Sequence, residues 1–221
     1  MDGSKSRRRF LAFSLGVFVD AAARKFGLYP YCAPRKYEAL AAATTTLDNL
    51  KAVYSREENA RQRYLAFAKK ADEEGIGKLA SLFRAAAKSK EFQVRNHAEA
   101  IEKCGGTPSA SAAAPEVKSI RENLDAAIKF AKDGAETLYP SLLGKARDEG
   151  NKDAMKTFNY AKSGEEQILK FFLKAKETLD QWKGGGREFF VCPTCSYTVA
   201  KIDFAKCIVC FTLGEKYIKV T

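Results

Sequence analysis

The sequence predicts a mainly α-helical fold, a four-helix bundle followed by a small metal-binding β knuckle at the C-terminus. Apolar residues recur at helical spacing from about Thr45 onward, in four segments separated by two short loops and one long link. Four of the six cysteines then form two Cys-x-x-Cys pairs near the C-terminus. Paired cysteines in an otherwise cysteine-poor chain are typical of a metal site rather than a disulfide framework.

Residues 1–44 form an N-terminal segment with a different pattern. The stretch SRRRFL at residues 6–11 is similar to a twin-arginine export signal. The apolar run from Phe10 to Val19 is ten residues long, too short to span a bilayer but sufficient for a signal core. This pattern predicts a periplasmic or otherwise extracytoplasmic protein. The alternative is an apolar N-terminal helix in a cytoplasmic protein; either segment would allow contact with a membrane surface.

Two helices are expected between residues 45 and 104, because apolar residues lie there on single helical faces. The first face consists of Leu47, Leu50, Val53, Ala60, Tyr64 and Phe67. The second consists of Leu79, Phe83, Ala86, Val94, His97 and Ile101. Gly105 and Gly106 follow directly and supply a helix stop.

The link GGTPSASAAAPE at residues 105–116 separates these helices from two more. Pro140 is expected to kink the third helix, because proline cannot donate the backbone hydrogen bond of a helix interior. The apolar residues of the third helix are Leu124, Ile128, Ala131, Ala135 and Leu138. Those of the fourth are Met155, Phe158, Ala161, Ile168, Leu169 and Phe172. Residues 45–182 therefore suit a four-helix bundle with one crossover connection.

The second pair of helices repeats the first at an offset of 75 residues. KADEEG at residues 70–75 recurs as KARDEG at residues 145–150, and the same offset relates Phe83 to Phe158. A repeat at one fixed spacing predicts that the bundle is a duplicated helical hairpin. Residues related by this offset should lie at equivalent depths in the bundle.

With these features the chain resembles the rubrerythrin family, in which a ferritin-like bundle precedes a rubredoxin-like knuckle. The resemblance covers roughly residues 45–220 and rests on ENARQRY in the first helix, TLYP in the third and the two cysteine pairs. It implies a bundle that binds two irons and reduces peroxide with electrons from the iron of the knuckle. It also implies a homodimer or a subunit of a larger assembly, and a redox partner protein.

A di-iron centre in such a bundle takes a Glu from each of two helices and a Glu-x-x-His turn from each of the other two. Glu57 and Glu165 lie in phase with the apolar faces of their helices, so both are expected to point inward. The repeat aligns Lys90 with Glu165 and Gln93 with Ile168, so neither turn keeps its histidine. The sequence predicts that no di-iron centre forms at the seven vestigial positions Glu57, Lys90, Gln93, Ala131, Gly134, Glu165 and Ile168.

Lys90 is expected to supply the positive charge that two inward carboxylates need. Without a cation the two acids would repel each other and lose hydration, so we predict an ion pair between Lys90 and at least one of them. The alternative is that Lys90 extends to the end of the bundle and leaves the acids in a wet cavity. His97, the one histidine of the chain, is expected to be a polar core residue rather than a ligand.

The C-terminal knuckle, residues 183–221, is predicted to bind one metal ion through Cys192, Cys195, Cys207 and Cys210. Four thiolates on two tight turns suit tetrahedral zinc or a single iron. Iron is implied by the resemblance alone, through CPTCSY and the preceding FFV, and zinc is the alternative. A glycine normally follows the second cysteine of each pair in the family, where φ is positive; Ser196 and Phe211 stand there in this chain.

Three functions are compatible with these residues. The favoured one is electron transfer or a redox-accessory role through one Fe(Cys)4 centre. The second is an oxidoreductase, a rubrerythrin-type peroxide reductase. The third is a structural or accessory subunit with zinc in the knuckle. The net charge of +11 does not indicate specific nucleic-acid binding, because the basic residues are spread along helices beside acidic ones.

Overall fold

The computed structural model of the chain describes residues 44–111 and 113–221. The predicted export signal and its apolar run lie outside the described residues. Within the described part, no helix combines the length and apolar character that crossing a membrane requires.

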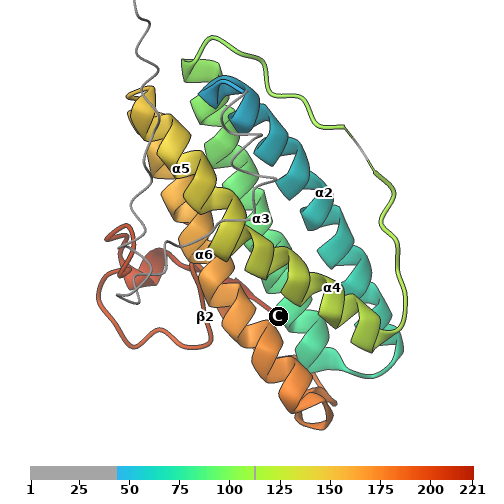
Figure 1. Cartoon of the computed structure of the whole chain (residues 1–221). Coiled ribbons are helices and arrows are strands. Elements are labelled where there is room, and N and C mark those ends of the chain that lie inside the picture. Colours follow the sequence, from blue (N-terminus) through green and yellow to red (C-terminus); the bar gives the residue numbers. More distant parts are fainter. Residues whose placement is uncertain (1–43, 112) are drawn as a thin grey trace, which may run out of the picture. The chain divides into compact units, whose positions relative to one another are not determined.

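Four long helical stretches form a bundle, as Figure 1 shows. The third stretch is composite, because two α-helices are joined there through one π-helical turn. In chain order the elements are α2 (Thr46–Glu73), α3 (Gly77–Lys103), α4 (Ile120–Asp133), η2 (Gly134–Leu138), α5 (Tyr139–Asp148) and α6 (Lys152–Glu177). The long link runs along the outside of the bundle from the end of α3 to the start of α4, which is the predicted crossover (Figure 1).

Local sequence explains where α2 and α4 begin. The Thr45 hydroxyl accepts a hydrogen bond from the Asp48 backbone N–H at 3.1 Å, and the Asp48 carboxylate accepts one from the Thr45 N–H at 3.1 Å. Ser119 and Glu122 form the same reciprocal pair before α4. This arrangement satisfies N–H groups that the first turn of a helix leaves without partners.

The predicted duplication is visible in the backbone. Gly75 and Gly150, which are related by the offset, have φ of 70° and 68°, a conformation that glycine adopts without strain. In both turns the next N–H returns to the helix, from Ile76 to the Ala71 carbonyl and from Asn151 to the Ala146 carbonyl, each at 2.8 Å. The two hairpins therefore turn in the same way.

The expected kink at Pro140 takes the form of a π-helical turn in the residues just before it. The Tyr139 N–H donates to the carbonyl of Gly134, five residues back, instead of four. Pro140 has no N–H to donate to Glu136, and its ring would crowd that carbonyl in a regular α-helix. The wider turn removes this conflict, and the helix continues as α5.

The C-terminal residues form a small three-stranded sheet beside the bundle. Strand β1 (Phe189–Val191) lies between β2 (Thr198–Val199) and β3 (Ile218–Val220) and pairs antiparallel with both. The short 3-10 helix η3 (Leu179–Trp182) precedes β1 in the chain, and a second one, η4 (Gly214–Lys216), lies between β2 and β3. The Trp182 ring stacks on Phe189 with centroids 6.4 Å apart, and Phe189 belongs to the same apolar cluster as the bundle core. The sheet and bundle thus share a core.

The bundle core has two apolar parts with charged residues between them. One part contains Tyr64, Phe83 and Phe172, and the other contains Leu50, Ile101 and Phe158. Glu57 in α2 and Glu165 in α6 each lie between residues of the two parts. Their carboxylates are therefore held at mid-height in the bundle.

Candidate functional site

The four knuckle cysteines converge on one point. Their sulfur atoms all lie within 4.8 Å of one another, with 3.4 Å between Cys192 and Cys210 and 3.6 Å between Cys195 and Cys207. Tetrahedral coordination with metal–sulfur bonds of about 2.3 Å places sulfurs about 3.8 Å apart. The thiolates are therefore already near the spacing that one metal ion needs, and the predicted four-cysteine group is present.

Each cysteine pair sits on the same type of tight turn. The N–H of Ser196 donates to the Cys192 carbonyl, and the N–H of Phe211 donates to the Cys207 carbonyl, both at 3.0 Å. Ser196 and Phe211 have φ of 65° and 62°, as expected from the glycines they replace. For a residue with a side chain this conformation costs about 1 kcal/mol or more. Phe211 gains little burial in return, because 74% of it is exposed.

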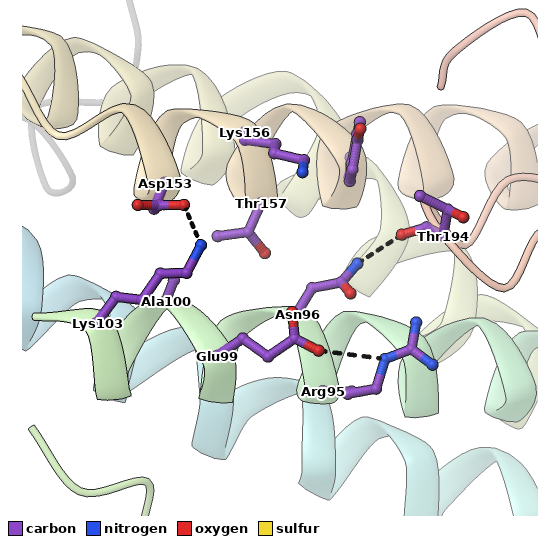
Figure 2. Close-up of a pocket in the computed structure, with 10 residues that line it drawn as sticks. Arg95, Asn96, Glu99, Ala100, Lys103, Asp153, Lys156, Thr157 and Thr194 are labelled. Atoms are coloured by element: carbon purple, nitrogen blue, oxygen red, sulfur yellow. Dashed lines mark hydrogen bonds and ion pairs between the residues drawn. The ribbon is translucent and has the colours of Figure 1, made fainter. Parts of the chain in front are cut away.

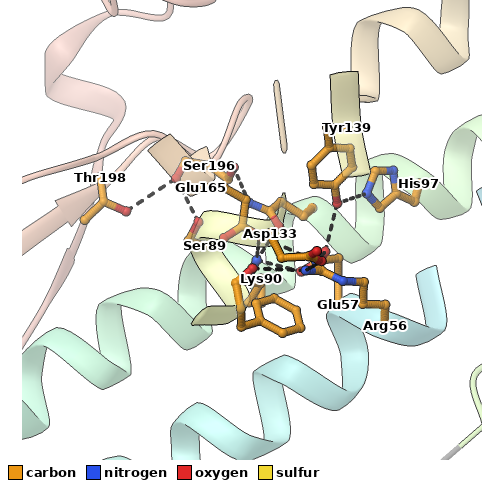
Figure 3. Close-up of polar contacts among 12 residues, drawn as sticks. Arg56, Glu57, Ser89, Lys90, His97, Asp133, Tyr139, Glu165, Ser196 and Thr198 are labelled. Atoms are coloured by element: carbon orange, nitrogen blue, oxygen red, sulfur yellow. Dashed lines mark hydrogen bonds and ion pairs between the residues drawn. The ribbon is translucent and has the colours of Figure 1, made fainter. Parts of the chain in front are cut away.

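A buried charge cluster occupies the centre of the bundle (Figure 3). The Lys90 ammonium lies 2.6 Å from Glu57 Oε2 and also contacts Glu165 Oε1, and all three side chains are at most 1% exposed. The expected ion pair is thus present, and it involves both acids. The alternative in which Lys90 extends to the end of the bundle is wrong.

Arg56 is a second cation of this cluster, which sequence reasoning missed. Its Nη1 lies 2.5 Å from Glu57 Oε1, and its Nη2 donates to the Phe130 carbonyl at 3.1 Å. The guanidinium also lies over the Phe130 ring, 3.6 Å from its centroid. Arg56 borders the buried face of α2, three residues after Val53 and four before Ala60, and its side chain is 19% exposed. The available signal was charge balance, because two buried acids beside one lysine require another cation.

The pKa values of the two carboxyls shift in opposite directions. Burial opposes ionisation of Glu57, but the attraction of Lys90 and then of Arg56 outweighs it and lowers the Glu57 pKa to about 2. Burial raises the pKa of Glu165 to about 7; Lys90 opposes this shift and repulsion from Glu57 adds to it. Glu57 is therefore the ionised member of the pair, and Glu165 is the one that binds a proton near neutral pH.

A chain of hydrogen bonds extends from Glu57 through the other half of the core. The Tyr139 hydroxyl donates to Glu57 Oε1 at 2.8 Å and lies 3.3 Å from His97 Nε2. His97 Nδ1 lies 2.9 Å from the Thr157 hydroxyl. Burial lowers the pKa of His97 to about 4, so the ring is neutral at pH 7. His97 is a polar core residue, as expected.

Three further positions of the predicted vestigial set, Ala131, Gly134 and Ile168, hold small or apolar residues. Ala131 and Ile168 are buried. A Cβ at Gly134 would lie 2.9 Å from Glu165 Cγ and 3.2 Å from its Cδ, so the Glu165 side chain fills the space that a side chain at position 134 would need. Position 134 is accordingly closed to a third acid as long as Glu165 keeps this conformation.

Gln93 links the charge cluster to the knuckle. Its Oε1 accepts from the Lys90 ammonium at 3.0 Å, and its Nε2 donates to the Ser196 hydroxyl at 3.2 Å. The Ser196 carbonyl accepts from the Ser89 hydroxyl at 3.0 Å. A Cβ at Gly164 would lie 2.6 Å from the Ser196 hydroxyl, so this glycine allows the first cysteine loop to approach α6 closely. The sequence does not reveal this link, because Gln93 and Ser196 are 103 positions apart.

A pocket of about 180 Å³ lies beside the same loop (Figure 2). Asn96 Nδ2 donates to the Thr194 carbonyl at 2.8 Å and so ties α3 to the loop at this pocket. The pocket is lined by Arg95, Asn96, Glu99, Ala100, Lys103, Asp153, Lys156, Thr157, Tyr160 and Thr194. Thr157 thus connects the pocket with His97 and the buried cluster.

Comparison with known proteins gives concordant results. The family model for rubrerythrin matches residues 48–176. Nigerythrin from Nitratidesulfovibrio vulgaris is 33% identical over 77% of this chain and 84% of its own length. Rubrerythrin-2 from Clostridium acetobutylicum is 27% identical over 78% of this chain and 95% of its own length. A solved structure of fully reduced nigerythrin matches with a TM-score of 0.74 and 30% identity, covering 80% of this chain and 87% of that one.

Proposed function

This chain belongs to the rubrerythrin family, and on that premise we propose that it is an electron-transfer or redox-accessory protein that works through one Fe(Cys)4 centre. The single observation that carries this proposal is the position of Lys90 between Glu57 and Glu165. The Lys90 ammonium occupies the position at which the family resemblance implies iron. We therefore assign the redox role to the metal of the knuckle. The whole fold, a ferritin-like bundle with a rubredoxin-like knuckle, is that of the family.

Two irons do not fit the centre of this bundle. The cluster offers two carboxylates, whereas a di-iron centre of this type draws four carboxylates and two imidazoles from the four helices. Arg56 and Lys90 would add two positive charges beside the metal ions and repel them. Within residues 44–111 and 113–221, the knuckle cysteines are the one group of three or more candidate ligands that converges.

The residues of the knuckle do fit a single iron. When bound there, iron supplies reversible exchange of one electron. The chain holds the sulfurs in a largely buried site and directs polar groups at them, with the Val209 N–H 3.5 Å from Cys207 Sγ and the Thr212 hydroxyl 3.2 Å from Cys210 Sγ. Such contacts tune a reduction potential. Iron rather than zinc is supported by the solved nigerythrin described as all ferrous.

The purified protein should contain one iron per chain and be red, because ferric thiolate absorbs visible light strongly. Elemental analysis and a visible spectrum measure both properties. A colourless protein with one zinc would instead indicate the structural or accessory function. About three irons per chain, the loading that an intact di-iron centre and the knuckle together imply, would contradict the degenerate centre and favour the peroxide reductase.

We also propose export through the twin-arginine stretch, since that route carries folded protein with its metal already bound. Replacing Arg7 and Arg8 by Lys should then keep the protein in the cytoplasm, whereas replacing Arg61 and Arg63 by Lys should not. Fractionation of the cell compartments measures this. An unchanged distribution would favour the cytoplasmic alternative.

We further propose that the protein is a homodimer and exchanges electrons with a redox partner protein, as the family resemblance implies.

A further inference from the structure

We propose that Glu165, together with Glu57, is a proton-binding site coupled to the knuckle metal, so that reduction of the metal draws a proton onto a carboxylate oxygen of Glu165. The balance is one electron from an external one-electron donor to the metal and one proton from solvent to Glu165. This inference rests on the proposed function, because the metal must change its charge. It assigns the buried cluster a role beyond replacing iron.

The first support is a direct hydrogen-bonded connection between the two centres. Ser196 immediately follows the ligand Cys195, is fully buried, and accepts from Gln93, which in turn accepts from Lys90. The Lys90 ammonium contacts Glu165. Charge interactions along such a path are weakly screened, because Lys90, Gln93 and Ser196 are each at most 1% exposed. A negative charge added at the metal is therefore felt at the acid.

The second support is the set of charges that face Glu165. From α2 these are Arg56, whose Nη1 lies 4.0 Å from Glu165 Oε1, and the carboxylate of Glu57, with the Tyr64 hydroxyl nearby. From α3 and α5 they are the Lys90 ammonium and the Tyr139 hydroxyl. His97 interacts with Glu57, and Asp133 pairs with Arg56 at 3.4 Å. Burial outweighs both cations and holds the Glu165 pKa at about 7, where a small change of potential alters its protonation.

The third support is a route by which a proton can reach the buried pair. Thr157 lines the pocket in Figure 2, and from it the hydrogen bonds run through His97 and Tyr139 to Glu57. A neutral imidazole donates from one ring nitrogen and accepts at the other, so it can pass a proton on. Glu57 and Glu165 meet at the Lys90 ammonium, which completes the path (Figure 3).

The test is the reduction potential of the full-length iron protein as a function of pH, by spectroelectrochemical titration. The potential should fall as the pH rises through the neutral range, with a slope of up to ~59 mV per pH unit for one proton per electron. Glu165→Gln should abolish this slope. Gln93→Met should reduce it, because the acid remains but its connection to Ser196 is broken. Glu166→Gln is the matched control, because that acid is the next residue of α6, pairs with Lys162 at the surface, and should leave the slope intact.

A rate measurement tests the proton route separately. Thr157→Val should leave the slope unchanged and slow the return to equilibrium after a pH jump by about tenfold or more. A red, iron-containing protein whose potential does not change with pH would overturn the inference and leave the proposed function standing. The same slope in Glu165→Gln as in the wild type would also overturn it. A colourless zinc protein would overturn both.

Discussion

Replacing Lys90 by Met should lower the free energy of unfolding at pH 7 by about 3–5 kcal/mol, the usual cost of removing one partner from a buried ion pair. Lys90 is 1% exposed and contacts two buried carboxylates, so its loss leaves Glu57 and Glu165 facing each other without the ammonium. Methionine preserves most of the bulk, and the effect is therefore electrostatic. Denaturant unfolding followed by circular dichroism measures the change.

The loss should depend on pH, and its direction follows from the two carboxyls. In the wild type the low pKa of Glu57, about 2, contributes stability that is present above pH 4.5 and is lost as the pH falls toward 2. The raised pKa of Glu165, about 7, contributes stability below pH 4.5 that is lost as the pH rises toward 7. Without Lys90 both values shift upward, because the attraction that lowered them is gone. The deficit relative to the wild type should therefore be largest at neutral pH and shrink toward pH 4.5.

Two further variants show whether the charge is responsible. Lys88→Met makes the same substitution on α3 at a surface lysine that pairs with Glu91, and it should change stability little. Adding Glu165→Gln to Lys90→Met should recover part of the loss, because one acid then remains beside Arg56. His97 titrates in every variant, so each is compared with the wild type at the same pH. Equal losses for both lysine variants at all pH values would contradict the ion-pair account.

Replacing Cys192 by Ser should abolish tight metal binding, and this is the larger of the two effects. Structural zinc sites in zinc-finger peptides bind with apparent free energies of about 10–16 kcal/mol near neutral pH. Loss of one of the four thiolates weakens such binding, because it removes one metal–sulfur bond. Hydrogen exchange should then accelerate around the cysteine loops, while α2, α3 and α6 keep their protection through their own apolar cores. Metal analysis after dialysis against a chelator and hydrogen-exchange mass spectrometry measure both.

The matched control is Cys104→Ser. Cys104 lies at the end of α3, outside the cysteine cluster, and contacts Asn151 at 3.2 Å. This variant should keep its metal. Retention of tightly bound metal in Cys192→Ser would show that the four thiolates do not form the site.

Much of the candidate site could be predicted from the sequence because its signals are short-range. The two cysteine pairs each close within four residues, so their spacing alone predicts tight turns with sulfurs on one side. Glu57 and Glu165 lie in phase with apolar faces, and helix periodicity is sufficient to place them inside. The fixed offset of 75 then aligned Lys90 with Glu165 and predicted the contact between them.

Arg56 and the π-helical turn could not be predicted in the same way. The guanidinium reaches the core only because the Phe130 ring and carbonyl, 74 residues away, receive it. The distortion before Pro140 depends on how the third helix accommodates the hydrogen bond that proline cannot donate, and a kink or a π turn is compatible with the same sequence. The local sequence pattern therefore fixes neither the direction of the Arg56 side chain nor the form of this distortion.

The helices, the duplicated hairpin, the group of four cysteines and the position of Lys90 among inward acids could all be predicted, because each depends on periodicity or spacing along the chain. The connection between these parts became visible in the folded structure alone. Gln93 contacts Ser196 across 103 positions, and Gly164 provides the room for that approach. Such contacts arise where two surfaces meet, and the geometry of that meeting follows from the packing of the whole core rather than from any one stretch of residues.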